Sequence, residues 1–156
     1  MPLKLQQHAL EPRSKQPPTH TVRLPFFFSS QCHTRNRLSD ANTLPVKAQT
    51  AGTPTLPGLS SNASYLENDV ATDISKGVLS QAVTIDLSRS LIDTTQCATF
   101  TELSCASNKK PYVIHTRMLF SADGAQITGI QTVLAKDGDW AFNAAGQLKC
   151  KCCFLS

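Results

Sequence analysis

The spacing of apolar residues predicts one amphipathic helix near the middle of the chain. Its apolar side chains recur every four residues on one helical face: Leu66, Val70 and Ile74. Ser64 and Glu67 have the spacing of a capping box, in which each side chain bonds an amide of the first turn. Gly77 supplies a left-handed stop at the C-terminal end. We therefore predict a helix over residues 64–77.

Further along the chain, a two-residue alternation predicts an antiparallel hairpin. Within residues 112–120 the apolar and polar side chains fall on opposite faces: Ile114, Met118 and Phe120 against His115 and Arg117. Asp123-Gly124 is typical of a hairpin turn, and residues 127–135 give the returning strand with Ile130 and Leu134 on one face. Asp137-Gly138 marks a second turn before a short apolar piece at residues 140–142.

A helix followed by antiparallel strands predicts the α+β class, with one N-terminal helix packed on a small, curved antiparallel sheet. We place this domain at residues 62–148. About ninety residues is near the lower limit for one hydrophobic core. Such thin cores are often completed by a second subunit, a disulfide or a further part of the fold, and the sequence leaves all three open. The abrupt change in composition at Lys149 is compatible with an incomplete fold.

Residues 1–61 are predicted to be a disordered, basic tail. They contain eight prolines, each of which lacks an amide donor and disfavours helix in the residue before it. The first fifty residues carry seven Lys or Arg against two acids, whereas residues 51–156 carry eight against nine. These basic residues are scattered, which argues against nucleic-acid binding. The segment lacks the apolar core of a secretory signal, and a transit peptide is a weaker alternative.

His115 and Arg117 are the candidates for catalysis. On one strand face, the imidazole would act as a general base while the guanidinium binds an anion or polarises a carbonyl. The alternative is that both side chains simply face solvent. No cofactor or metal site is predicted, because the cysteines near the C-terminus lack a second ligand pair at suitable spacing for zinc.

Two further features would require an oxidising or secretory compartment. Cys97 and Cys105 lie eight residues apart, a spacing that would allow a small disulfide loop. Asn62-Ala63-Ser64 is an acceptor triplet for N-glycosylation. In the cytosol, the two cysteines would instead be free thiols.

Residues 149–156 form a cysteine-rich tail that resembles a lipidation signal. Cys153-Phe154-Leu155-Ser156 fits the prenylation box, in which a final Ser favours farnesyl. Cys152 and Cys150 would then be sites of palmitoylation, the second signal that stable anchoring requires. This pattern predicts an association with a membrane surface. No stretch of eighteen or more apolar residues is present to span a bilayer.

Four short runs carry a family resemblance: residues 91–103 (LIDTTQCATFTEL), 111–114 (PYVI), 137–140 (DGDW) and 142–144 (FNA). Over residues 62–148, the chain resembles an uncharacterised fungal family of secreted type that is related to the NTF2-like and SnoaL-like cone fold. The resemblance implies that Cys97 is paired and that Trp140 lies in the core. It gives no catalytic role to His115, which stands where the family more often has a small residue.

The resemblance also carries the functional hypotheses. Related proteins include cyclases and isomerases of secondary metabolism as well as binding modules without catalysis, so fold alone does not decide function. The first hypothesis is a protein that binds a hydrophobic small molecule and assists a non-redox cyclisation or isomerisation. The second is a non-enzymatic binding protein, secreted or lipid-anchored, and the third is a truncated, inactive family member. The termini favour a cytoplasmic or membrane-associated protein, whereas the family favours secretion.

Overall fold

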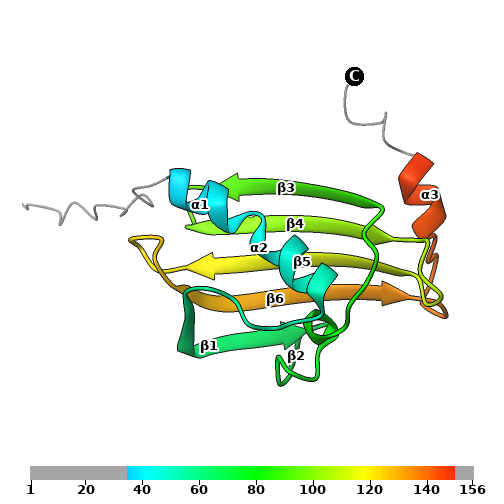
Figure 1. Cartoon of the computed structure of the whole chain (residues 1–156), viewed down its shortest axis with the longest axis horizontal. Helices are drawn as coiled ribbons and strands as arrows, with labels where there is room; N and C mark the ends of the chain where they lie inside the picture. Colours follow the sequence, from blue (N-terminus) through cyan, green and yellow to red (C-terminus); the bar gives the residue numbers. More distant parts are fainter. Residues whose placement is uncertain (1–34, 150–156) are drawn as a thin grey trace, which may run out of the picture.

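The computed structural model describes residues 35–149, which form a mixed sheet with helices packed against it (Figure 1). The elements follow in chain order: α1 (Arg35–Ala41), α2 (Leu44–Ala51), β1 (Leu59–Glu67), β2 (Val70–Ala71), the 3-10 helix η1 (Val78–Ser80), β3 (Leu87–Asp93), β4 (Ala98–Cys105), β5 (Tyr112–Phe120), β6 (Ile127–Lys136) and α3 (Ala144–Lys149). The strand order is β2-β1-β6-β5-β4-β3. No helix in this part of the chain is long and apolar enough to cross a membrane.

The α+β class is confirmed, and the predicted hairpin is observed as β5 and β6. Their bounds are Tyr112–Phe120 and Ile127–Lys136, so only the end of β6 differs from the prediction, by one residue. Gly124 and Gly138 adopt the left-handed conformations that the two turns require, with φ of 69° and 95°. The sheet is not wholly antiparallel, however, because β1 runs parallel to β6.

The helix predicted over residues 64–77 is wrong. The segment forms β1, a two-residue turn and the short strand β2. Asn68 and Asp69, at φ of 50° and 63°, make this turn, and both residue types tolerate the left-handed region. Glu67 does not cap a helix, since its Oε2 atom accepts hydrogen bonds from the Tyr65 hydroxyl and the Val78 amide. Pairing with β6 therefore overrides the local helical signal.

The predicted domain boundary at residue 62 is also wrong. The described unit begins at α1, and α2 packs Ala48 and Gln49 into the protein interior. Pro45 lies in the first turn of α2, where its missing amide costs no intrahelical hydrogen bond. Gly52, at φ of 63°, ends the helix in the left-handed conformation. The prediction of disorder for residues 1–34 lies outside the described residues.

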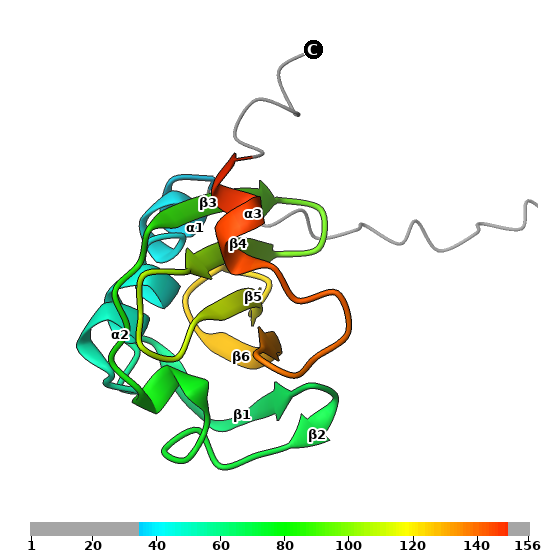
Figure 2. The ribbon, with the colours of Figure 1, turned by 90° about the vertical axis from the view of Figure 1, so that its right-hand side faces the viewer.

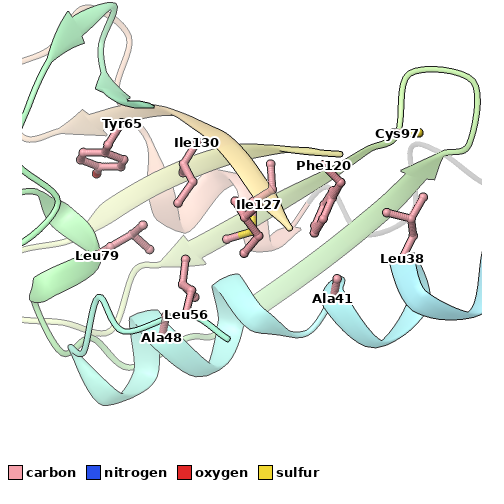
Figure 3. Packing of buried hydrophobic residues seen from close by; sticks show 11 residues of the cluster. Leu38, Ala41, Ala48, Leu56, Tyr65, Leu79, Cys97, Phe120, Ile127 and Ile130 are labelled. Carbon is pink, nitrogen blue, oxygen red and sulfur yellow. The ribbon is translucent and has the colours of Figure 1, made fainter. Parts of the chain in front are cut away.

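The sheet has two unlike faces. On the covered face, α1 and α2 pack over buried side chains, including the fully buried Ile130 (Figure 3). Ile114 and Met118, on the same face, are also fully buried. Figure 2 shows both helices on the same side of the sheet. The opposite side of β3 to β6 is the open face, which carries Leu91, Phe100, Glu102, His115, Arg117 and Val133. The short helix α3 lies at one end of this face, where the Ser104 hydroxyl donates to the carbonyl oxygen of Ala144.

Trp140 does not lie in the core, contrary to what the family resemblance implied. Its side chain is 97% exposed. The connection from β6 to α3 is directed away from the sheet by the turn at Gly138, and it is held by the carboxylate of Asp139, which accepts from the Lys136 amide at 2.8 Å. The core is built instead from aliphatic residues, Met118, Tyr65 and Phe120.

Candidate ligand groove

A groove between α2 and the start of β3 has a volume of about 590 Å³. We call it the α2 groove, and its lining is Val46, Thr50, Ala82, Val83, Thr84, Ile85, Ser88 and Asn108. One wall is α2, and the other is the extended segment before β3. The groove therefore lies on the side of the sheet that the helices cover.

A buried glutamine joins the two walls of this groove. Gln49 on α2 is 0% exposed, and its Nε2 atom donates to the carbonyl oxygens of Val78 at 2.7 Å and Gln81 at 2.8 Å. The Val83 amide donates back to the Gln49 carbonyl at 3.1 Å. Because unmet buried amides are costly, these hydrogen bonds fix the segment against the helix and so fix the width of the groove.

The far side of the segment is held by a paired side-chain amide. Asn108 accepts from the Thr84 amide at 2.9 Å and donates to the Thr84 carbonyl oxygen at 2.7 Å. Next to it, Asp86 accepts from both the hydroxyl and the amide of Ser107. These two bonds hold the pKa of Asp86 below its ordinary value. The groove wall is thus formed before any ligand arrives.

The chemistry of the α2 groove is that of a binding site. Val46, Val83 and Ile85 give it an apolar part, and the hydroxyls of Thr50 and Ser88 give it a polar part. None of its lining side chains ionises near neutral pH. A general acid or base is therefore missing from the lining, while apolar side chains and hydroxyl oxygens that can accept a hydrogen bond are present.

A second, smaller pocket of about 230 Å³ lies beside β1 and contains Tyr65 and Asp73. The Tyr65 hydroxyl donates to Glu67 at 2.8 Å, and burial together with this carboxylate raises the pKa of Tyr65. Asp73 is exposed, and hydrogen bonds from Ser75 lower its pKa. Tyr65 therefore stays protonated and Asp73 stays ionised at neutral pH, and both are engaged in local hydrogen bonds.

His115 and Arg117 lie on one face of β5, as the sequence predicts, but that face is the open face. The His115 Nε2 atom lies 4.0 Å from Glu102 Oε1, and the His115 ring is 5.6 Å from the ring of Phe100. Glu102 is the cross-strand neighbour of His115, a partner that the sequence alone does not reveal. Neither His115 nor Arg117 lines the two pockets described above.

The predicted disulfide between Cys97 and Cys105 is wrong. Cys97 precedes β4 and Cys105 ends it, so an extended strand separates them by about 25 Å. A disulfide needs Cα atoms within about 7 Å of each other. Cys105 is a buried free cysteine, and its burial raises its pKa to about 11. The Sγ atom of Cys97 lies 3.9 Å from the carbonyl oxygen of Ala122.

Of the predicted modification sites, the structure describes only Asn62. Asn62 is exposed at an irregular part of β1, where the pairing with β6 shifts register, and its glycosylation stays a prediction. The lipidation sites Cys152 and Cys153, with Cys150, lie outside the described residues. Within residues 35–149, no group of three or more His, Cys, Asp or Glu side chains is arranged to hold a metal ion.

In comparisons with known proteins, no family model matches this chain, and neither does any curated protein.

Proposed function

We propose that this protein binds a small, mainly apolar molecule in the α2 groove. The observation that carries the proposal is the groove itself, whose volume of about 590 Å³ falls in the range of about 300 to 1,000 Å³ common to small-molecule sites. Its lining combines an apolar wall with separate hydroxyls, which suits a ligand with one polar end. The hydrogen bonds of Gln49 and Asn108 form the groove in advance, and this lowers the entropic cost of binding.

Binding without catalysis is the form of the proposal that the site supports best. The α2 groove lacks an ionisable side chain, and the candidate base His115 lies on the other face of the sheet. A cyclisation or isomerisation by general acid-base chemistry would need such a group within hydrogen-bond reach of the ligand. The resemblance to SnoaL-like proteins extends the proposal to a metabolite of fungal secondary metabolism, held by a binding module of NTF2-like fold.

A titration with 2-naphthol, followed by the amide resonances of the ¹⁵N-labelled protein, tests the groove assignment. This probe combines an apolar ring system with one hydroxyl. We expect saturable shifts at Val83, Ile85 and Ser88, because these residues line the α2 groove. Shifts centred on Tyr65 and Ile130 would place the ligand in the pocket beside β1 instead and would contradict the proposal.

A matched pair of serine variants completes the test. Ser88→Phe fills the groove from its β3 side, whereas Ser61→Phe adds the same side chain at an exposed position on β1. We expect S88F to weaken 2-naphthol binding at least tenfold, about 1.4 kcal/mol, and S61F to leave it unchanged. Equal effects of the two variants would show that the probe binds elsewhere.

A further inference from the structure

The open face carries three large apolar side chains that are exposed to solvent. Leu91, Phe100 and Val133 are 70%, 38% and 58% exposed, and all three lie on this face. Leu91 and Phe100 are directly paired between β3 and β4, and Val133 is two strands away beside His115. Large apolar side chains that gather on one uncovered face mark an interaction surface.

Trp140 belongs to the connection between β6 and α3. The connection from β6 to α3, which carries Trp140, lies on the side of the sheet away from α1 and α2 (Figure 2). The turn is well formed, because Asp139 accepts from the Lys136 amide through its side chain and from the Phe142 amide through its carbonyl oxygen. An ordered turn that presents an almost fully exposed tryptophan is typical of an anchor residue at a protein interface.

The charges of the open face favour a second copy of the same chain as the partner. Cross-strand pairs place Arg89 beside Glu102 and Asp93 beside Ala98, with Arg117 on the next row. Two cations and two anions therefore share one face. An anionic membrane or a nucleic acid would be matched by cations alone, whereas a face of mixed charge can pair with itself about a two-fold axis.

The area of the open face is also large enough for a reversible contact between two copies. Strands β3 to β6 have 7 to 10 residues. At spacings of about 4.8 Å between strands and about 3.3 Å along them, they cover about 500 Å² in plan. A buried tryptophan adds about 200 Å². Since α3 covers one end of the face, the available area lies below the roughly 800 Å² that each partner contributes to a standard interface, as in a weak, reversible dimer.

We propose that two copies of this protein associate through their open faces, with Trp140 of each copy packed against the apolar part of the other. The dimer uses the face opposite to α2, so both α2 grooves stay accessible. The sheet–sheet contact buries Leu91, Phe100 and Val133, and the pairs of opposite charge set the relative orientation of the copies.

Sedimentation velocity of the full chain tests the proposal, with reducing agent present so that thiols outside the interface do not cross-link the copies. We expect a concentration-dependent dimer between about 1 µM and about 200 µM. Trp140 is the only tryptophan, so its emission reports the same event without any mutation. It should shift to shorter wavelength as the dimer forms, because the indole leaves water.

Two variants of matched exposure identify the surface. Val133→Glu buries a charge in the proposed interface, whereas Val70→Glu makes the same change at a 64% exposed valine on β2. We expect V133E to raise the dimer dissociation constant at least tenfold and V70E to leave it unchanged. Circular dichroism verifies that both variants are folded.

Three results would overturn the proposal. One is a monomer throughout the concentration range. Another is a dimer that V133E and V70E weaken to the same extent. The third is a dimer whose formation leaves the emission of Trp140 unchanged.

Discussion

The two faces of the sheet use alternate residues of the same strands, yet they have opposite surroundings. On β5, Met118 is fully buried under the helices, while its neighbour Arg117 is exposed on the open face. Because side chains of successive strand residues point to opposite sides, each face can be changed without direct contact with the other. We infer that the covered face determines stability and the α2 groove, and that the open face determines association.

Substitution of Met118 should give the largest effect on stability. Met118→Ala removes a fully buried side chain and leaves a cavity in the core, so we expect a loss of about 2–5 kcal/mol in the free energy of unfolding. Arg117→Ala, one residue away, should stay within about 0.5 kcal/mol of wild type. Urea denaturation measures both. Similar losses for the two variants would contradict the division between the faces.

Substitutions of two glycines compare the packing on the two sides of the sheet, with smaller expected effects on stability. A Cβ atom at Gly77 would lie 2.5 Å from the Tyr65 ring and 2.8 Å from the Glu67 carboxylate, and Tyr65 is itself buried. We expect Gly77→Ala to cost about 1–3 kcal/mol, because the packed ring cannot move aside freely. The measurement is again the free energy of unfolding in urea.

Gly129→Ala is the control on the open side of β6. Its nearest new neighbours would be the Ser64 hydroxyl at 3.1 Å and the Leu119 side chain at 3.4 Å, both of which have room to adjust. We expect a change within about 0.5 kcal/mol. If G129A were as costly as G77A, the open face would be as tightly packed as the covered one.

Local patterns in the sequence predicted the β5–β6 hairpin well, because every signal for it lies within about thirty residues. Alternation gave the faces of both strands, and two Asp-Gly pairs gave the turns. The helical spacing over residues 64–77 failed because β1 is stabilised by a distant partner. The Asn68 side chain, for example, accepts a hydrogen bond from the Leu134 amide, 66 residues further on. Such non-local pairing is invisible to a local pattern.

The N-terminal helices were missed for a different reason. Pro45 is one of the eight prolines that predict a disordered tail, although the first turn of a helix tolerates proline, and Gly52 has the position of a C-terminal stop. These two residues were a usable signal for α2. Neither β3 nor β4 is assigned from the sequence, since β3 has no buried residue and β4 buries the polar residues Thr99, Thr101 and Ser104.

The candidate sites were harder to predict than the fold. The sequence placed His115 and Arg117 together correctly, but it could not show that their face lacks the groove. The α2 groove is lined by small, common residues from three separate segments, so no spacing in the sequence predicts the groove. Gln49, which fixes its width, resembles any polar residue of a helix until its burial is known.

The smallest expected effect concerns Asp86, which lies at the start of β3 and belongs to neither face. Hydrogen bonds from Ser107 lower its pKa in the folded protein, so the carboxylate adds stability at neutral pH that is lost as the pH falls through its folded pKa, below about 4.

Asp86→Asn should therefore be less stable than wild type at pH 7, and the difference should shrink as the pH is lowered past that range. Asp137→Asn removes the same charge at another exposed aspartate and controls for the loss of one negative charge. Because Asp86 is exposed, we expect its effect on stability to be smaller than that of G77A. Thermal melts between pH 7 and the acid range measure the difference in stability between D86N and wild type. If this difference persists unchanged at low pH, Asp86 supports the groove wall through packing rather than through its charge.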